Sequence, residues 1–184
     1  MKVNYVTGNK IKFDYATQKL NKFDVELVQT KLEIEEIQSH DKLGVAIHKA
    51  KQAFEITKEA LFVTDTFWEI PALNGFPGAF MKYVNSWFVP QDFLNLMKDK
   101  TDRRIFCHDS IVYIDNDGVK TFEDIVVGEI AEEIYEDGEE LDSVDNLVKF
   151  EGKYLKEHHK ENWQNLKEEN QNWKNFAEFL KSKN

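Results

Sequence analysis

The segment LFVTDTFWEIPALNGFPGAF, residues 61–80, constrains the fold of this chain more than any other stretch. It begins with Leu61–Val63, a short apolar run that is typical of a buried strand. We expect this strand to end on Thr64-Asp65-Thr66, so that the Asp65 carboxylate lies at its carboxyl end. Ligands of open α/β sheets bind at that end of the strands. The segment therefore predicts an α/β fold, with Asp65 either in a ligand site or acting only as a capping residue.

A loop rich in glycine and proline follows this predicted strand. Pro71 comes first, and Gly75-Phe76-Pro77-Gly78 ends the loop. Glycine adopts backbone conformations and permits close approaches that residues with a side chain do not. The pattern therefore predicts a tight turn shortly after Asp65.

The chain begins with a predicted strand at residues 2–6 and the polar loop Thr7-Gly8-Asn9-Lys10. The helix expected next has an apolar face formed by Phe13, Ala16 and Leu20. Backbone N–H groups and the positive end of the helix dipole at such a loop can bind a phosphate. The loop lacks the GxxxxGK[ST] pattern, and the alternative is that Thr7 or Asn9 is an ordinary helix cap.

A second strand is expected at residues 24–30, and the alternating run KLEIEEIQ at residues 31–38 predicts a strand edge. The acidic residues of this run are Glu33, Glu35 and Glu36. Alternation places successive side chains on opposite faces, so the run is compatible with an ordinary solvated edge. Chain order would also allow one of these carboxylates to meet Asp65.

A second helix is predicted from Leu43, with Asp41 as its N-cap. Its apolar stripe consists of Leu43, Ala46, Ile47, Ala50 and Phe54. Lys49 lies at the margin of the stripe, where a lysine is ordinarily solvated. Because this helix leads into the strand at Leu61, the first half is expected to follow the order β–α–β–β–α–β.

The second half of the chain is expected to be an antiparallel sheet with additional helices. The predicted elements are helices at 79–88 and from Pro90, and strands at 104–114, 119–122 and 125–130. The tail, about residues 157–181, predicts one long helix. Its apolar side is formed by Trp163, Leu166, Trp173, Ala177 and Leu180. Tryptophans on one helix face most often serve packing.

Composition excludes several classes of protein. With 184 residues the chain suits a single domain, and its net charge of −10 argues against binding a nucleic-acid polymer. Nothing approaches the ~20 consecutive apolar residues of a membrane span. A single cysteine, Cys107, excludes an internal disulfide. Together with the absence of a signal-peptide pattern, it leads us to expect a cytoplasmic protein.

Three stretches in order resemble motifs of the inosine triphosphate pyrophosphatase family. Thr7-Gly8-Asn9-Lys10-Ile11-Lys12 is similar to the family's [ST]-x-N-x-x-K opening. Glu36-Ile37-Gln38 with the later Lys49-Ala50-x-x-Ala53 resembles its E-[IY]-Q and KA-x-x-A patterns. Asp65-Thr66 followed by Ala72-Leu73-Asn74-Gly75-Phe76-Pro77-Gly78 resembles its acid-[ST] and AL-x-G-x-PG signature. Each match is short, but their order across roughly residues 1–130 makes the combined resemblance specific.

The resemblance implies an α/β fold with an elongated mixed β-sheet flanked by helices. Residues 1–184 would form a single domain of two lobes with a cleft between them. The implied reaction is Mg²⁺-dependent hydrolysis of a nucleoside triphosphate, of the ITP, XTP or dITP type, to a monophosphate and pyrophosphate. Such chemistry needs an activated water, a hard cation and positive charge near the triphosphate. The family also implies a homodimer, for which Trp68 and the segment 83–88 could supply the interface.

The resemblance also implies roles for individual residues. Glu36 would hold the metal, and Asp65 would hold the metal or activate the water. Lys12 and Lys49 would contact the triphosphate. The phosphate-binding loop would use Thr7 and Asn9, and Lys82 would add a further phosphate contact.

The family's C-terminal elements are altered here. Of its late F-G-x-D-P-x-F segment at most the acid remains, as Asp145, and Asn172-Trp173-Lys174 lies where S-H-R is expected. Asp145 and Lys174 are therefore candidate substrate contacts, and the base specificity is open. Loss of a side chain that hydrogen-bonds to the base can change the discrimination between substrates by orders of magnitude. The alternative function is a nucleotide-binding homologue with weak or no catalysis.

Overall fold

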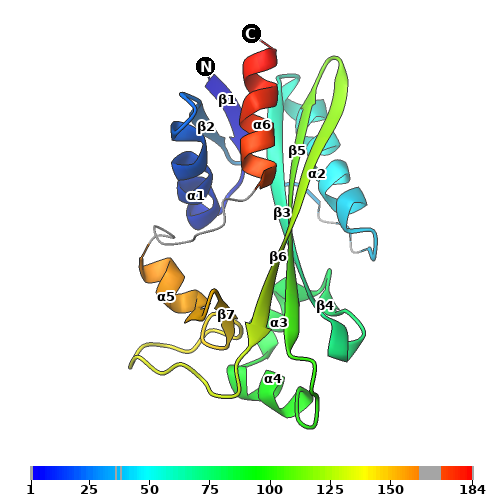
Figure 1. Cartoon of the computed structure of the whole chain (residues 1–184). Helices are drawn as coiled ribbons and strands as arrows, with labels where there is room; N and C mark the ends of the chain where they lie inside the picture. The colour runs from blue at the N-terminus through cyan, green and yellow to red at the C-terminus, as the bar shows by residue number, and fades with distance from the viewer. Residues whose placement is uncertain (1, 36, 38, 162–170, 184) are drawn as a thin grey trace. The chain divides into compact units, whose positions relative to one another are not determined.

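The computed structural model of the chain describes residues 2–35, 37, 39–161 and 171–183 (Figure 1). The strands are β1 (Lys2–Val6), β2 (Glu26–Thr30), β3 (Leu61–Ile70), β4 (Phe76–Gly78), β5 (Arg104–Asp115), β6 (Gly118–Ile130), β7 (Val148–Phe150) and β8 (Lys153–Tyr154). The α-helices are α1 (Lys10–Asn21), α2 (Lys42–Thr57), α3 (Met81–Trp87), α4 (Pro90–Leu96), α5 (Leu155–Lys160) and α6 (Gln171–Ser182).

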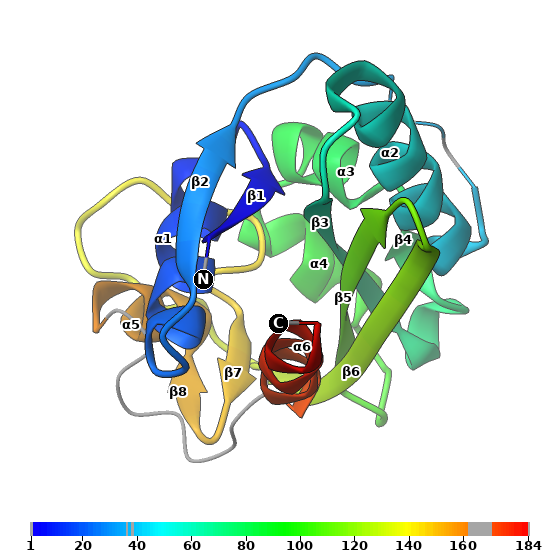
Figure 2. The same ribbon diagram turned by 90° about the horizontal axis from the view of Figure 1, so that it is seen from above.

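The strands join in one mixed sheet of order β2-β1-β3-β5-β6-β7-β8, with β4 paired to β3. β1 is parallel to β2, from Lys2 opposite Glu26 to Val6 opposite Thr30 (Figure 2). It is also parallel to β3, where Tyr5 lies opposite Phe62. The pairs β3–β4, β6–β7 and β7–β8 are antiparallel. The expected mixed α/β sheet is therefore confirmed.

The chain divides into two compact units. Unit 1 comprises Met1–Thr66, Asp109–Asp124 and Asn170–Asn184. Unit 2 comprises Phe67–His108 and Ile125–Glu169. A single domain of two lobes stays a prediction, and each unit is described by itself.

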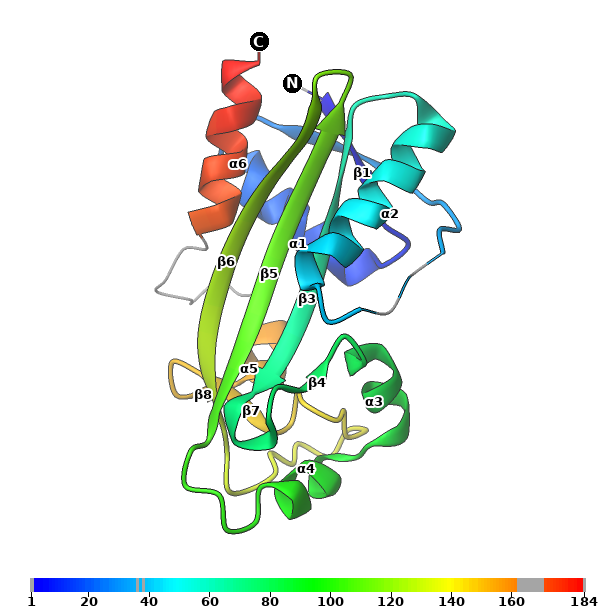
Figure 3. The ribbon, with the colours of Figure 1, turned by 90° about the vertical axis from the view of Figure 1, so that its right-hand side faces the viewer.

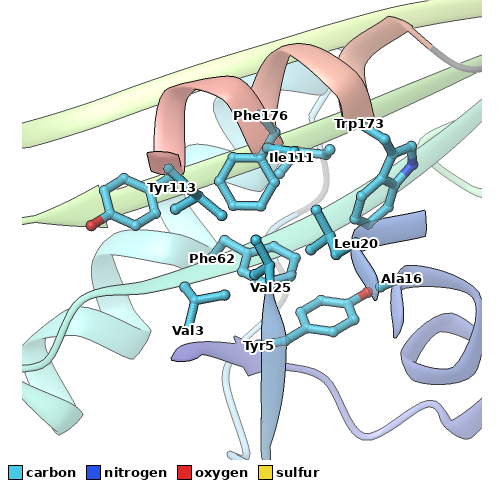
Figure 4. Close-up of a cluster of buried hydrophobic side chains, with 12 residues drawn as sticks. Val3, Tyr5, Ala16, Leu20, Val25, Phe62, Ile111, Tyr113, Trp173 and Phe176 are labelled. Carbon is cyan, nitrogen blue, oxygen red and sulfur yellow. The ribbon is translucent and has the colours of Figure 1, made fainter. Parts of the chain in front are cut away.

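Unit 1 has helices on both faces of its strands, because apolar residues occupy consecutive positions in β1, β3 and β5. Successive side chains of a strand point to opposite faces. One set packs with α1 and α6, namely Val3, Tyr5, Phe62, Ile111 and Tyr113 (Figure 4). The other set packs with α2, namely Val6, Leu61, Val63, Val112 and Ile114. Figure 3 shows α2 and α6 on opposite sides of these strands.

Unit 2 has one main core cluster, in which α3, α4 and α5 pack with the remaining parts of the long strands. Its buried members include Ile70, Met81, Val84, Phe93, Ile105, Ile130, Val148 and Leu155. Trp68 packs against this cluster, with its ring 6.0 Å from that of Phe150. The loop after β3 turns through Gly75 and Gly78, at positive φ angles of 89° and 58°. The expected tight turn is therefore present.

Two expected strand boundaries are wrong. β3 continues from Leu61 to Ile70, so Asp65 lies within it and not at its end. The reason is that Thr66–Ile70 contains residues that favour strands, and β4 pairs with this part. Residues 119–130 form one strand and not two, because Asp124 is accommodated within β6 as an acceptor for the backbone N–H of Gln171.

Two further expectations need correction. Residues 31–35 are not in a strand. The expected tail helix does not begin at residue 157 and run on, because α5 ends at Lys160 and α6 begins at Gln171. Trp163 and Leu166 lie outside the described residues, whereas Trp173, Ala177 and Leu180 are buried as expected.

Candidate functional site

The loop between β1 and α1 is held by its own polar side chains. Asn9 caps α1, and its side-chain oxygen accepts a hydrogen bond from the backbone N–H of Lys12 at 3.2 Å. The backbone N–H of Asn9 donates to Thr7 Oγ1 at 3.1 Å, and the N–H of Thr7 donates to the carbonyl of Thr30 at 3.1 Å. Asn9 therefore has the capping role that the sequence left as an alternative, and Thr7 shapes the loop before the helix.

The same loop has the properties of an anion site. A Cβ at Gly8 would meet no atom within 4 Å, so the backbone there is open to close approach. No acidic residue lies in the first turn of α1. The first N–H groups of a helix have no partner within it, and its positive dipole end favours negative charge. The capped loop is therefore compatible with phosphate binding.

The two predicted triphosphate lysines lie on different helices of unit 1. Lys12 is half-buried in the first turn of α1. Lys49 is half-buried in α2, where Val45, Ala46 and Ala53 at neighbouring helical positions are buried. Both side chains thus lie at the margin of a buried face, and neither is a fully solvated lysine.

Asp65 lies just beyond the carboxyl end of β1. With Tyr5 opposite Phe62, counting along the strands brings Thr7 level with Thr64. Asp65 is half-buried, and its Oδ1 accepts a hydrogen bond from the backbone N–H of Thr66 at 3.0 Å. Although β3 continues, the parallel pairing of β1 with β3 ends here. Asp65 therefore lies at the edge where open α/β sheets commonly bind ligands.

Lys49 and Asp65 belong to the same face of unit 1. Asp65 continues the row of Leu61 and Val63, which face α2. α2 ends at Thr57, and β3 runs back beside it from Leu61. The four residue steps from Leu61 to Asp65 span about 13 Å, which is the length of about nine helical residues. This estimate brings Lys49 roughly level with Asp65.

A neutral hydrogen-bonded pair lies next to the loop. Tyr5 is 1% exposed, and its hydroxyl lies 2.6 Å from Thr64 Oγ1. Burial raises the pKa of Tyr5 well above its usual value, against hydrogen bonds from Thr64 and Thr7 that lower it. Tyr5 therefore stays neutral and supports Thr7 and Thr64 from the core.

The first turn of α6 is tied to β5 through Asp109. Its Oδ2 accepts hydrogen bonds from Asn172 Nδ2 at 3.0 Å and from Trp173 Nε1 at 3.2 Å. Burial raises the pKa of Asp109, whereas hydrogen bonds from Asn172 and the nearby charge of Lys12 lower it. Asn172 and Trp173 are buried and structural, while Lys174 is exposed on α6.

Two predicted substrate contacts lie in unit 2. Lys82 is exposed on α3. Asp145 is half-buried, and its Oδ2 lies 2.8 Å from His159 Nδ1. The carbonyl of Asp145 accepts the backbone N–H of Lys156 at 2.9 Å. Asp145 is thus held by two contacts to α5.

Comparison with protein-family models matches residues 3–179 to the Ham1 family. The chain belongs to the Ham1 family. Among curated proteins it is similar to the dITP/XTP pyrophosphatase of Saccharolobus solfataricus, 31% identical over 134 residues that cover 73% of this chain and 70% of the relative. It is also similar to the dITP/XTP pyrophosphatase of Ignicoccus hospitalis, 34% identical over 136 residues that cover 72% and 70% of the two chains.

Solved Ham1 structures share the fold of this Ham1 protein. The Staphylococcus aureus Ham1 protein gives a TM-score of 0.77 with 21% identity and 100% coverage of both chains. A HAM1 protein from Coxiella burnetii gives a TM-score of 0.80 with 19% identity and 99% coverage of both. The family and fold that the three motifs implied are therefore confirmed.

The donor chemistry of this Ham1 protein is compatible with a hard divalent cation. Within the described ranges, no group of three or more histidine, cysteine or acidic side chains is assembled for a metal. Mg²⁺ seldom needs such a cage, because one or two carboxylates and the substrate phosphates commonly hold it. Asp65 offers one half-buried carboxylate. Glu36, the second predicted ligand, lies outside the described residues.

No helix in the described part of the chain is long and apolar enough to cross a membrane.

Sequence reasoning missed Tyr5 and Asp109. Tyr5 appeared only as part of a strand, although its alternation with Val3 indicates a core-facing position. Asp109 is an acidic residue within the otherwise strand-forming segment RIFCHDSIVYI. A carboxylate in a buried strand needs a hydrogen-bond donor or a positive charge beside it. This need was the only indication in the sequence that Asp109 has a specific role. The partner lies 63 residues away in Asn172, which no local pattern indicates.

Proposed function

We propose that this Ham1 protein hydrolyses nucleoside triphosphates to a monophosphate and pyrophosphate, with non-standard purine nucleotides of the ITP, dITP or XTP type as substrates. The observation that carries the proposal is its 31% identity to a curated dITP/XTP pyrophosphatase across 70% of that relative. The described geometry supports it, because the capped loop, Lys12, Lys49 and Asp65 all lie in unit 1 around the end of its parallel strands.

In the proposed site the triphosphate binds to the loop and to two lysines. Thr7 and Asn9 hold the loop in a shape that presents backbone N–H groups to a phosphate. Lys12 and Lys49 supply positive charge at the margins of α1 and α2. Fixed positive groups stabilise the charge that develops during attack at a phosphorus atom.

We propose Mg²⁺ as the divalent cation, with Asp65 and Glu36 as its protein ligands. When bound, the cation would neutralise phosphate charge and polarise the phosphorus that is attacked. As the alternative role of Asp65, we propose that its carboxylate orients or deprotonates the attacking water. The bond from the Thr66 N–H orients its carboxylate for either role.

Three further contacts are proposed with the substrate. Lys82 would contact phosphate from α3, and Asp145, held by His159, would help to recognise the nucleoside. Lys174, which is exposed on α6, is the third proposed contact. Because Trp173 is buried against the core, the family's S-H-R readers have no direct replacement at that position, which favours an altered base preference.

The test is a product assay with Mg²⁺ and a panel of ITP, XTP, dITP, dUTP and the common nucleoside triphosphates. We expect pyrophosphate from ITP, XTP or dITP, and inorganic phosphate only as a minor product. Pyrophosphate from another nucleotide would keep the reaction and change the substrate. Absence of turnover together with an increased melting temperature would overturn the proposal in favour of a nucleotide-binding homologue.

We further propose a homodimer and a cytoplasmic location. The single cysteine, Cys107, suits a reducing compartment. Exposed aromatic residues on α3, including Trp87 at 71% exposure, support a contact surface there.

A further inference from the structure

Asp109 is a carboxylate of unit 1 that the proposed reaction does not use. Its Oδ2 accepts two hydrogen bonds from α6, from Asn172 at 3.0 Å and from Trp173 at 3.2 Å. Asn172 is fully buried and Trp173 is 3% exposed, so both donors are held by the core. The carboxylate is therefore fixed in place and cannot swing away into solvent.

The packing of α1 brings Lys12 to the same region. Lys12, Tyr15 and Ala16 are three and four positions apart, so they share one face of the helix. Ala16 lies in the core cluster, and the Tyr15 ring lies edge-on to that of Trp173 with centroids 6.0 Å apart. Figure 4 shows Ala16 and Trp173 in this cluster. Lys12 therefore lies at the start of the face of α1 that packs beside Trp173, the residue that donates a hydrogen bond to Asp109.

Electrostatics agrees with this placement. The positive charge of Lys12 acts to lower the pKa of Asp109, which burial raises. Lys12 is therefore a charged neighbour that acts on Asp109 through space. A lysine side chain has enough rotatable bonds to turn between two neighbouring anions.

We propose that Asp109 is the counter-charge of Lys12 and sets the affinity of this Ham1 protein for the triphosphate chain. The inference rests on the proposed function, since it assigns Lys12 to phosphate. The fixed carboxylate competes with an incoming phosphate for the Lys12 ammonium and repels the phosphate itself. It weakens binding of triphosphate and of the pyrophosphate product, and so speeds product release.

The first turn of α6 has a structural role in this arrangement. Asn172 and Trp173 do not read a base, but hold Asp109 where its charge acts on Lys12. Asp109 acts through Lys12, so it is a positioning residue and not a catalytic one.

The test compares binding of inorganic tripolyphosphate to wild type and to Asp109→Asn by isothermal titration calorimetry. The amide oxygen of asparagine can still accept both α6 bonds, so the variant removes charge and little else. We expect the dissociation constant to fall about threefold or more, because the variant removes one negative charge that repels the anion. The KM for the nucleotide should fall with it, and pyrophosphate should inhibit more strongly.

Two further variants isolate the mechanism. Asp124→Asn is the matched control, because Asp124 also accepts a hydrogen bond from the first turn of α6, from Gln171 N–H at 2.8 Å. The charge of Asp124 also acts on Asp109, so this variant should change tripolyphosphate binding, but less than Asp109→Asn does. In a Lys12→Gln background, Asp109→Asn should lose most of its effect, since the two residues act as a pair.

The outcomes separate this inference from the proposed function. If wild type releases no pyrophosphate from any nucleotide, the function fails, while the binding comparison still tests Asp109. If wild type is active and Asp109→Asn binds tripolyphosphate equally or more weakly, the inference is wrong. An equal gain in the Lys12→Gln background also overturns it. Should Asp109→Asn be unstable, Asp109→Ser removes the same charge and is judged by the same criteria.

Discussion

Asp65 is a predicted site residue whose place in its strand was predicted wrongly. The sequence pattern predicted that Asp65 ends a strand, whereas β3 continues to Ile70. The register of β1 with β3 nevertheless brings Asp65 to an edge of the sheet, because the parallel pairing of these strands ends beside it. Its role depends on its charge and on the edge it occupies, and not on the end of its own strand.

Asp65→Asn is predicted to lower the rate of pyrophosphate release by about a hundredfold or more, because the amide can neither bind a proton nor hold a cation as the carboxylate does. The amide oxygen retains the bond from Thr66 N–H, so folding should be little affected. The measurement is kcat with dITP and Mg²⁺. Glu59→Gln removes an exposed carboxylate near the same strand and serves as the control. Wild-type turnover in Asp65→Asn would mean that the site assignment is wrong.

Asp115 provides a pH-dependent prediction. Burial raises its pKa, but hydrogen bonds from Lys183 at 2.5 Å, from the N–H of Asp117 at 2.9 Å and from the Tyr113 hydroxyl at 3.1 Å together hold it below the usual range. A depressed pKa in the folded state adds stability above the unfolded pKa, about 3.9, and this contribution disappears as the pH falls through the folded pKa.

The measurement for Asp115 is urea unfolding of wild type and Asp115→Asn between pH 2 and pH 7. We expect wild type to be more stable at neutral pH and the difference to shrink below about pH 4. A difference that is constant over the whole range would contradict the assigned pKa shift.

At the level of elements, local patterns identified α1 and α2 well. The stripes of these helices have the spacing of one helix face, and the capping residues Asn9 and Asp41 precede them as expected. The tail was predicted less well, because α5 and α6 each have the mixture of apolar and charged residues that one continuous helix would have. Residue spacing does not show where a helix is interrupted when both parts are amphipathic.

Asp41→Ala is predicted to lower the free energy of unfolding by about 1 kcal/mol, as loss of an N-cap commonly does. Asp41 Oδ1 accepts the backbone N–H of Gly44 at 2.9 Å, and alanine leaves that donor unpaired. The measurement is urea unfolding at neutral pH. Lys51→Ala, at an exposed position of α2, is the control for a side-chain truncation on this helix. Equal stability of the two variants would exclude a capping contribution from Asp41.

At the level of the whole molecule, the exposed aromatic surface of α3 bears on assembly. Tyr83 and Trp87 are 42% and 71% exposed, and their ring centroids lie 5.6 Å apart. Trp68, the residue first suggested for a dimer contact, packs against the core of unit 2. Trp87 is therefore the better candidate for a contact between copies.

Trp87→Ser is predicted to shift the protein from dimer towards monomer, because an exposed tryptophan is a common anchor of an interface. The measurement is the molar mass by light scattering over a range of concentrations. Leu96→Ser, which removes another exposed apolar side chain of unit 2, is the comparison. A dimer unchanged in Trp87→Ser would remove this surface from the interface.

The sequence by itself determined the family and the fold class of this protein, and most of its strands and helices. These follow from short motifs and from periodic patterns, in which neighbouring residues carry the information. It also selected Thr7, Asn9, Lys12, Lys49 and Asp65, because each lies in a motif. Their catalytic and binding roles stay predictions.

Only the tertiary structure decided which distant residues meet. The pairing of β1 with β3 brings Asp65 to the end of the parallel strands. The docking of α6 brings Asn172 and Trp173 to Asp109, across 63 and 64 residues of sequence. Such contacts depend on strand register and on the packing of helices against the sheet, and both are set by the whole core at once. Local patterns contain no record of them, which is why Asp109 emerged only from the folded chain.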